Sequence, residues 1–259
     1  RKSGGGTFDV FTPYWRECLA APTPREPLGQ GRTKNQNEFH EILTGTVDDL
    51  KLVPPRAKWP EKLAEHWDVS ERGAQRQLTD FCHEGLAHYA KQRDNPSIPY
   101  GSSKVSPYLR FGLLSPHQCW HAAGKVCQGK ALEKYRFELG WREFGYYVLY
   151  HHPDLAWKNF DSAYDKYPWA EGHVKMESWQ QGQTGIPIVD AGMRQLWKTG
   201  WMHNRTRQIV ASLLTKHMGV HWRRGEEWFW DTLVDADPGV NGFSWQWVAG
   251  SDTDAAAYC

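Results

Sequence analysis

The chain has 259 residues, of which 15 are Trp, 11 Tyr and 10 Phe, and its formal net charge is +1 at pH 7. This length fits one large domain or two small ones, and the low net charge excludes a polycation that coats DNA or an anionic membrane through charge alone. The five cysteines form no CxxC pair, no apolar run reaches membrane-spanning length, and the N-terminus lacks a signal-type apolar segment. We therefore expect a monomeric, cytoplasmic protein without a membrane partner.

Residues 1–60 are rich in Gly and Pro, and we interpret them as a connector with one short helix around "YWRECLA", a tether outside the core. Over residues 71–94 the apolar side chains recur every three or four positions, which predicts one amphipathic helix; they are Leu78, Phe81, Cys82, Leu86 and Tyr89. The connector is thus expected to lead into a helical domain spanning residues 61–259.

Two Ser-Pro pairs, Ser106-Pro107 and Ser115-Pro116, each match a helix N-cap followed by proline at the first helical position. Gly112 fits the stop between these two helices. Further helices are predicted over residues 131–150, 188–199, 201–218, with Gly200 between the last two, and 224–234. With no period-two strand pattern and no internal repeat, the fold class is predicted to be all-α.

The segment "GSSKVSP" places three hydroxyls and a lysine just ahead of a predicted helix start. Free helix N–H groups and a positive dipole end suit a phosphate or pyrophosphate, although the spacing is not that of a Walker loop. The alternative interpretation is a capped helix start and nothing else.

The predicted helix "ALEKYRFELGWREFGYYVLY" puts Tyr135, Glu138, Arg142 and Gly145 on one stripe, with Trp141 beside Glu138. An acid, a guanidinium and large rings relieved by a glycine are typical of a cavity wall. The alternative is an i,i+4 salt bridge on a solvated face.

In "TGWMHNRTRQIVASLL", His203 and Arg207 share one helix face, while Asn204 and Gln208 share the next, with Arg205 at its side. Between residues 191 and 225 there are seven Lys or Arg and no Asp or Glu; they stand at positions 194, 198, 205, 207, 216, 223 and 224. This local basic patch suits phosphate contacts, and the alternative is a solvated basic face.

The segment "DADPGVNGFSWQWVAG" contains Asp235 and Asp237, which repel unless each has a cationic or hydrogen-bonding partner. Arg207 is the partner we expect. If Ser244 caps a helix, Trp245 and Trp247 lie about 200° apart and face opposite ways: one into the protein, the other into a cavity. Two core tryptophans are the alternative.

Together these segments resemble the flavin-binding helical domain of the photolyase/cryptochrome family. The resemblance runs from about residue 8 to the end, through "VFTPYWR", "GSSKVSPYLRFG", "ELGWREF", "WQQGQTGIPIVDAGMRQLWKTGWMHNRTR", "RRGEEWF" and "LVDAD…N…SWQW". It implies a U-shaped FAD, with Asn241 facing flavin N5. By position, the implied FAD contacts are Tyr89, Ser102, Ser103, Lys104, Val105, Ser106, Tyr135, Arg142, His203, Arg207, Asp235, Ala236, Asp237 and Asn241.

The resemblance also implies a function, light-driven electron transfer from reduced FAD to a cyclobutane pyrimidine dimer in DNA. Trp245, Trp222 and Trp169 match the electron relay, with Trp245 nearest the flavin. Glu138 is expected to hydrogen-bond the dimer, a task that needs a buried, protonated carboxyl. The positions matching the contacts to a flipped dimer are Glu138, Trp141, Arg142, Asn204, Arg205, Gln208 and Trp247. No metal site is predicted.

Several features depart from the family pattern. The N-terminal α/β antenna domain is absent and the chain stops at Cys259, where relatives continue, so truncation at both ends is expected. Gln208 replaces the methionine common in repair enzymes, Ser102 replaces threonine, and Ala257 stands where proline is usual. Two alternatives therefore stay open: a cryptochrome-like blue-light photoreceptor that binds FAD without repair, and a fragment that holds no flavin.

Overall fold

The structure, a computed structural model, describes residues 5–29, 45–52, 58–170 and 176–252. Every regular element in these ranges is a helix or a helical turn, and none of them contains a strand. The prediction of an all-α fold is confirmed. No helix in the described ranges is both long and apolar enough to cross a membrane. Cys259 and Ala257 lie outside the described residues.

A first group of helices packs around one apolar cluster that includes Leu78, Phe81 and Leu86. Its members are α3 (Glu71–Glu84), η2 (Leu86–His88), α4 (Tyr89–Gln92), α5 (Ser106–Arg110), α6 (Pro116–Val126) and α7 (Lys130–His151). The single helix predicted over 71–94 is broken at Gly85. A Cβ there would lie 2.2 Å from the carbonyl oxygen of Tyr100, so a close backbone approach requires glycine at this break.

The two Ser-Pro pairs begin their helices differently. Ser115 is the N-cap of α6, as predicted, and it also forms a capping box with Gln118. Ser106 is instead the first residue of α5, whose N-cap is Val105 without a side-chain cap. The Ser106 hydroxyl accepts a hydrogen bond from Trp201 Nε1 at 3.3 Å. The N-cap prediction is therefore wrong for Ser106, because its hydroxyl is hydrogen-bonded to the Trp201 indole and not to the first turn of α5.

A second group of helices packs around another cluster that includes Trp179, Trp222 and Trp245. It contains α8 (Met176–Gln180), α9 (Pro187–Thr199), α10 (Asn204–Ser212), the π-helical turn η4 (Leu213–His217), α11 (Trp222–Thr232) and α12 (Asn241–Ala249). Gly200 ends α9 in the left-handed conformation, with φ of 67°. This confirms the predicted separation of two helices there. α12 begins at Asn241, three residues before the predicted cap at Ser244.

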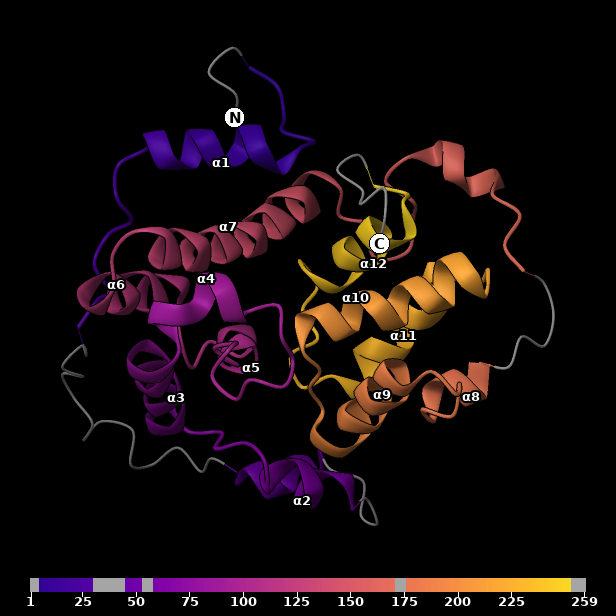
Figure 1. Ribbon diagram of the computed structural model, residues 1–259, viewed down its shortest axis with the longest axis horizontal. Coiled ribbons are helices and arrows are strands. Elements are labelled where there is room, and N and C mark those ends of the chain that lie inside the picture. Colours follow the sequence, from indigo (N-terminus) through magenta and orange to yellow (C-terminus); the bar gives the residue numbers. More distant parts are fainter. Residues whose placement is uncertain (1–4, 30–44, 53–57, 171–175, 253–259) are drawn as a thin grey trace.

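The first sixty residues include α1 (Phe11–Ala20), η1 (Val47–Leu50) and the start of α2 (Trp59–Ala64). α1 lies along α7 (Figure 1), where Phe11 is 1% exposed and its ring stacks on Trp141 with centroids 3.9 Å apart. Phe8 is buried in the same apolar cluster. The expectation of a tether outside the core is therefore wrong for residues 8–20.

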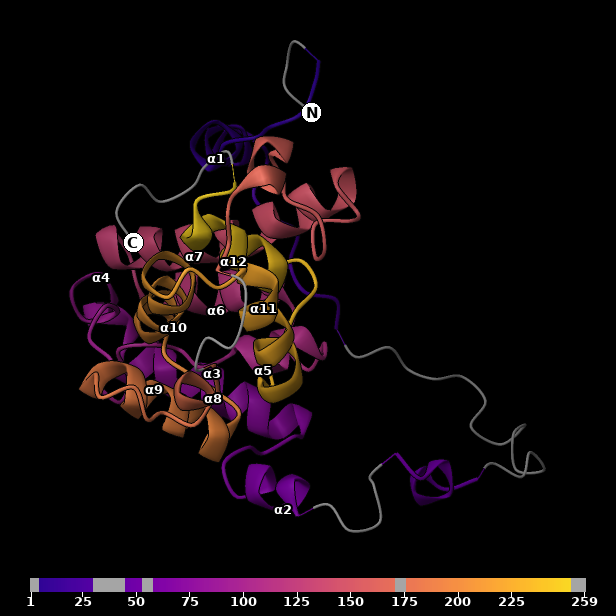
Figure 2. The same ribbon diagram turned by 90° about the vertical axis from the view of Figure 1, so that its right-hand side faces the viewer.

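The two helical groups lie side by side, the first on the left and the second on the right of Figure 1, and α12 contacts both α7 and α11. The turned view of Figure 2 likewise shows α7, α10, α11 and α12 next to one another. α7, α10 and α12 thus bring together segments far apart in the sequence.

Candidate functional site

A cavity of about 580 Å³ lies between the two helical groups. Its volume falls within the usual range for small-molecule and cofactor sites, about 300 to 1,000 Å³. The predicted site residues that line it are Tyr89, Ser102, Ser103, Lys104, Val105, Ser106, Tyr135, Glu138, Trp141, Arg142, Asn204, Arg205, Arg207, Gln208, Asp235, Ala236, Asp237, Asn241, Trp245 and Trp247. The fold thus gathers into one cavity most residues that the sequence placed on separate segments.

Asp235 and Asp237 form a buried acid pair at the cavity, 8% and 5% exposed. Asp235 Oδ2 accepts from Arg207 Nη2 at 2.8 Å, the partner that was expected. Asp237 Oδ2 accepts from Arg142 Nη2 at 3.0 Å and from the Tyr146 hydroxyl at 3.1 Å. Each carboxylate therefore has its own guanidinium, which offsets both repulsion and desolvation.

Arg142 shows why the stripe on α7 is a cavity wall. It pairs with Asp237 and Glu143, not with Glu138. The i,i+4 salt bridge of the alternative interpretation does occur on this helix, but between Lys134 and Glu138, one turn earlier. Gly145, however, does not line the cavity. A Cβ at Gly145 would lie 2.1 Å from the Gly239 carbonyl oxygen, so this glycine lets the loop that carries the buried acid pair approach the helix.

The loop Ser102–Ser106 is held in place from both sides. Gln77 Nε2 donates to the Ser103 carbonyl at 2.9 Å, and Trp201 Nε1 donates to Ser106 as described above. Lys104 has φ of 53°, and its Nζ lies 5.4 Å from the centre of the Trp201 ring. These contacts hold the loop in place, so that its hydroxyls and the lysine line the cavity. The helix that follows, α5, is only five residues long.

One acceptor at the cavity has no partner. Asp235 Oδ1 is buried and receives no hydrogen bond within the described chain, although Oδ2 of the same carboxylate is paired. A buried carboxylate oxygen without a donor costs free energy unless a ligand supplies one. The cavity therefore suits a polar ligand that donates N–H or O–H groups toward Asp235.

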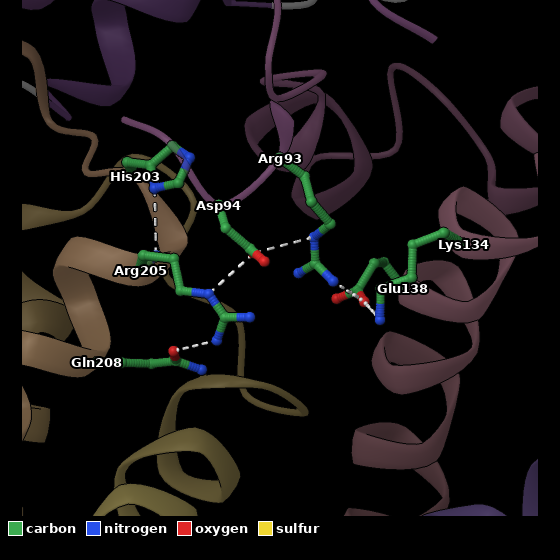
Figure 3. Close-up of polar contacts among 7 residues, drawn as sticks. All are labelled: Arg93, Asp94, Lys134, Glu138, His203, Arg205 and Gln208. Carbon is green, nitrogen blue, oxygen red and sulfur yellow. Dashed lines mark hydrogen bonds and ion pairs between the residues drawn. The ribbon is translucent and has the colours of Figure 1, made fainter. Parts of the chain in front are cut away.

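Glu138 belongs to a chain of charges that also contains Arg93, Asp94, Lys134, Arg205 and Gln208, called here the Glu138 network (Figure 3). Arg93 Nη1 and Lys134 Nζ contact Glu138 Oε1 at 2.5 and 3.0 Å. Asp94 Oδ1 lies 3.6 Å from Arg93 Nε and 2.9 Å from Arg205 Nε, and Arg205 Nη1 donates to Gln208 at 2.7 Å. The network joins the residues that follow α4 to α7 and α10.

The surroundings of Glu138 differ from the expectation of a buried, protonated carboxyl. Its side chain is 26% exposed, and two cations contact the same oxygen. The Glu138 carboxyl is therefore only partly buried, and its Oε1 accepts hydrogen bonds from Arg93 and Lys134. The expected full burial of this side chain is not observed.

Asn241 is held by a residue that sequence reasoning missed. Its Nδ2 donates to Glu226 Oε1 at 2.8 Å and to the Glu226 carbonyl at 3.1 Å. Glu226 is 7% exposed, and burial raises its pKa to about 7, with a smaller opposing effect from the Asn241 hydrogen bond. With Nδ2 engaged by Glu226, the amide oxygen is the free end of Asn241. The sequence hint was Glu226 itself, an acid on the apolar face of "RRGEEWF".

Arg93 was also missed, although it is 9% exposed and lines the cavity. The available signal was its position four residues after Tyr89, which places both on one helix face. Trp201 was missed as well. Its ring lines the cavity and its indole N–H holds the Ser102–Ser106 loop, a contact across 95 positions of sequence.

Three predicted site residues do not line the cavity. His203 is the N-cap of α10, where its Nδ1 accepts from the Arg205 N–H at 3.2 Å, and burial lowers its pKa. Its side chain therefore orients the start of α10, and its expected contact with FAD stays a prediction. Trp222 is buried behind the cavity in the second apolar cluster, and Trp169 packs against that cluster at its edge. Trp245 lines the cavity whereas Trp222 and Trp169 do not, which agrees with the expectation that Trp245 is the member of the relay nearest the flavin.

Trp245 and Trp247 both line the cavity. Trp245 is 3% exposed and its ring lies 5.0 Å from Phe229, whereas Trp247 is half-buried. Of the seven basic residues between 191 and 225, Arg205 and Arg207 line the cavity, and both are paired with acids. Part of the predicted basic patch is thus used inside the fold.

Comparisons with known proteins agree with this geometry. The sequence model of the family described as FAD binding domain of DNA photolyase matches residues 135–259. The deoxyribodipyrimidine photo-lyase of Agrobacterium fabrum is 40% identical over 98% of this chain and 53% of the relative. The same-named protein of Escherichia coli is 37% identical over 97% of this chain and 53% of the relative. The chain thus spans about half the length of these curated relatives.

Two solved structures show the same architecture. A bacterial class III photolyase from Agrobacterium tumefaciens superposes with a TM-score of 0.87 at 39% identity, covering 99% of this chain and 53% of that one. A cryptochrome from Synechocystis superposes with a TM-score of 0.69 at 34% identity, covering 74% of this chain and 41% of that one. The chain belongs to the photolyase/cryptochrome family, of which it represents the FAD-binding helical domain.

Proposed function

We propose that this chain binds FAD and forms the catalytic part of a light-driven enzyme that repairs cyclobutane pyrimidine dimers in DNA. The observation that carries the proposal is the cavity, where a fixed hydroxyl and lysine loop, a buried acid pair and aromatic walls meet. Its volume and chemistry match a long ligand with a pyrophosphate, ribose hydroxyls and flat rings.

The cavity residues fit FAD on several counts. The Ser102–Ser106 loop and Lys104 would hold the pyrophosphate, and the Arg142–Asp237 and Arg207–Asp235 pairs would bracket the polar edges of the rings. The unpartnered Oδ1 of Asp235 would accept a hydrogen bond from the ligand. The remaining proposed contacts are Tyr89, Tyr135, Ala236 and Asn241, whose free amide oxygen would face the flavin.

When bound, FAD supplies light absorption and transfer of single electrons. Trp245 would donate an electron into the cavity, and Trp222 and then Trp169 would replace it in turn. Trp141 and Trp247 would provide aromatic walls for a pyrimidine dimer flipped out of one strand of the duplex. Trp141 is well placed for this task because Phe11 stacks against its ring and fixes it.

The Glu138 network would hold the lesion by charge. Arg93 and Lys134 offer N–H donors beside Glu138, and Arg205 lies next to the exposed side chain of Asn204. Arg205 would contact phosphates or base edges once Asp94 releases it, since ion pairs at exposed positions exchange at little cost. Glu138 would act as an acceptor for N–H groups of the dimer.

FAD binding and repair are tested together on the full-length gene product. We expect FAD to bind with 1:1 stoichiometry by fluorescence titration, and blue light to repair a dimer-bearing oligonucleotide when the flavin is reduced. A bound flavin without repair would contradict the enzyme and support the second candidate, a cryptochrome-like photoreceptor. Gln208, locked to Arg205 beside the cavity, and the similarity to the Synechocystis cryptochrome favour that candidate.

We further propose that the protein works as a cytoplasmic monomer with damaged DNA as its partner. The free thiols of Cys18, Cys82, Cys119 and Cys127 support a reducing compartment. Gel filtration with light scattering tests the oligomeric state, and a dimer at micromolar concentration would contradict it.

Replacement of Trp245 by Phe tests the electron path. Phe fills most of the same space but is far harder to oxidise, so we expect Trp245→Phe to slow light-driven reduction of bound FAD at least about tenfold. Repair started from chemically reduced flavin is expected to change much less. Equal loss of photoreduction and repair would contradict the proposed role of Trp245.

A further inference from the structure

A series of aromatic rings runs from the surface to the buried Trp222. The exposed ring of Tyr167 lies 4.6 Å from Trp169, and Trp169 lies 5.0 Å from the imidazole of His221. The imidazole in turn lies 5.5 Å from the ring of Trp222. His221 therefore contacts both of the outer tryptophans of the proposed relay.

The position of His221 is fixed by the start of α11. Its Nδ1 accepts the backbone N–H of Arg223 at 3.1 Å, which makes His221 the N-cap of the helix. This bond leaves Nδ1 without a proton, so a neutral imidazole carries its proton on Nε2. In the neutral form the cap aims the ring between the two indoles, and a proton added at Nδ1 on acidification would replace the acceptor and break this cap.

The ring of Trp222 is anchored as well. Its Nε1 donates to Asn159 Oδ1 at 2.8 Å, and Asn159 Nδ2 donates to Asp165 Oδ1 at 2.7 Å. An acceptor on the indole N–H, backed by a carboxylate, stabilises positive charge on this ring. Trp222 is thus prepared to carry charge transiently, with His221 on its outer side.

The charge state of His221 depends on groups from two elements. Burial and then Arg223 of α11 lower the pKa of the imidazole below its ordinary 6.5, while Glu227 of α11 and Asp165 of η3 (Ser162–Lys166) raise it less. The imidazole is therefore neutral at pH 7 and gains a proton as the solution is acidified.

We propose that His221 couples Trp169 to Trp222 and that protonation of its ring keeps positive charge off both tryptophans. The inference rests on the proposed function, which supplies a light-excited flavin as the oxidant. In this step one electron leaves Trp169 and restores Trp222, which had lost one electron to Trp245. Trp222 is reduced and Trp169 is oxidised, so the charge moves outward by one residue.

A protonated imidazole opposes the arrival of positive charge on this tryptophan pair by simple electrostatics. A positive charge about 5 Å from both indoles raises the energy of a cation on either ring. Charge would then stay on Trp245 and return to the flavin. A neutral imidazole carries no charge that would disfavour a cation on either indole. Its ring lies between the two indoles and so provides a contact path for the electron.

Two substitutions at His221 separate the roles of the ring and of its charge. His221→Phe keeps an aromatic ring and removes the titration. His221→Asn removes the ring and keeps a good N-cap acceptor. The matched control is His152→Asn, because His152 packs against Phe160 at 4.5 Å and has no ring contact with Trp169 or Trp222 among the described residues. All are made in the full-length protein loaded with oxidised FAD.

The first readout is the rate of flavin photoreduction between pH 5 and 8. In wild type and in His152→Asn we expect the rate to fall on the order of tenfold upon acidification, because a charge about 5 Å away disfavours the cation. We expect His221→Phe to hold its rate across this range, and His221→Asn to be slow at every pH.

The second readout uses the protein without flavin. A protonated imidazole in contact with indoles quenches their fluorescence, so wild-type emission should fall with acidification by an increment that His221→Phe abolishes. The same increment should shrink in Trp222→Phe. An emission profile identical in wild type and His221→Phe would overturn the contact on which the inference stands.

The proposed function and this inference fail in different ways. If Trp222→Phe photoreduces like wild type, the relay itself is wrong. If Trp222→Phe is slow while both His221 variants follow the wild-type pH profile, the relay stands and the role of His221 is overturned.

Discussion

The cavity holds two sets of charges in contrasting surroundings. In the buried acid pair, Asp235 and Asp237 are 8% and 5% exposed and each is matched to an arginine. In the Glu138 network, the side chains of Asp94 and Arg205 are 54% and 40% exposed, and that of Glu138 is 26% exposed. Distances are similar in both sets, so exposure to water makes the difference.

The exposure of each set of charged side chains to water determines whether its ion pairs can exchange partners. A buried carboxylate that loses its partner is left without solvent, so the acid pair must stay intact and suits a resident cofactor. An exposed ion pair exchanges partners with water at little cost, so the Asp94–Arg205 end of the Glu138 network suits a substrate that comes and goes. The same residue types thus give a fixed site and an exchangeable one.

The largest expected effect comes from the buried acid pair. Asp237→Asn removes the charge that Arg142 and Tyr146 share, and we expect it to lower the free energy of unfolding by about 3 to 5 kcal/mol. Urea unfolding of the flavin-free protein measures this. Loss of less than about 1 kcal/mol would place Asp237 with the exposed set and erase the contrast.

Glu226 sharpens the comparison, because it is buried against an amide instead of a guanidinium. Burial raises its pKa from 4.5 to about 7. Between these values the folded state binds more protons than the unfolded state, so stability falls as pH rises from 4.5 to 7. The loss should reach about 2 to 3 kcal/mol.

Glu226→Gln keeps an oxygen for Asn241 Nδ2 and removes the titration. We expect this variant to lose the corresponding pH dependence of urea unfolding and to be more stable than wild type above pH 7. An unchanged slope of stability against pH in the variant would show that other groups cause it.

Gly145→Ala tests how the loop that carries the buried acid pair is seated. The added Cβ would meet the Gly239 carbonyl oxygen at 2.1 Å, so the loop must shift. We expect a loss of about 1 to 3 kcal/mol in stability, together with weaker FAD binding by titration. The control is Gly29→Ala, where no atom lies within 4 Å of an added Cβ.

The smallest effect on stability is expected in the Glu138 network. Asp94→Asn breaks the exposed pair with Arg205, and we expect the free energy of unfolding to change by less than about 1 kcal/mol. Affinity for a dimer-bearing oligonucleotide, measured by anisotropy, should change more than stability does. A stability loss as large as that of Asp237→Asn would show that the two sets do not differ.

Local patterns determined much of this protein. Apolar spacing predicted α7 and α9 within about one residue at each end, the capping box at Ser115 began α6, and Gly200 separated α9 from the next segment. These features follow from contacts within a few positions of the chain. The stripe on α7 even predicted a cavity wall, since helix geometry alone puts Tyr135, Glu138 and Arg142 on one side.

Contacts between distant segments required the tertiary structure. The Ser106 hydroxyl accepts a hydrogen bond from Trp201 and does not cap a helix. Gly85 interrupts a predicted helix where the Tyr100 carbonyl approaches, and Phe11 is buried in the core, where it stacks on Trp141. The partners of Glu138, Asp237 and Asn241 likewise come from other helices. The sequence by itself determined which residues carry charge, rings and helix signals. Only the packing of helices decided which charges are buried and paired, because the cost of desolvation depends on neighbours that sequence spacing does not bring together.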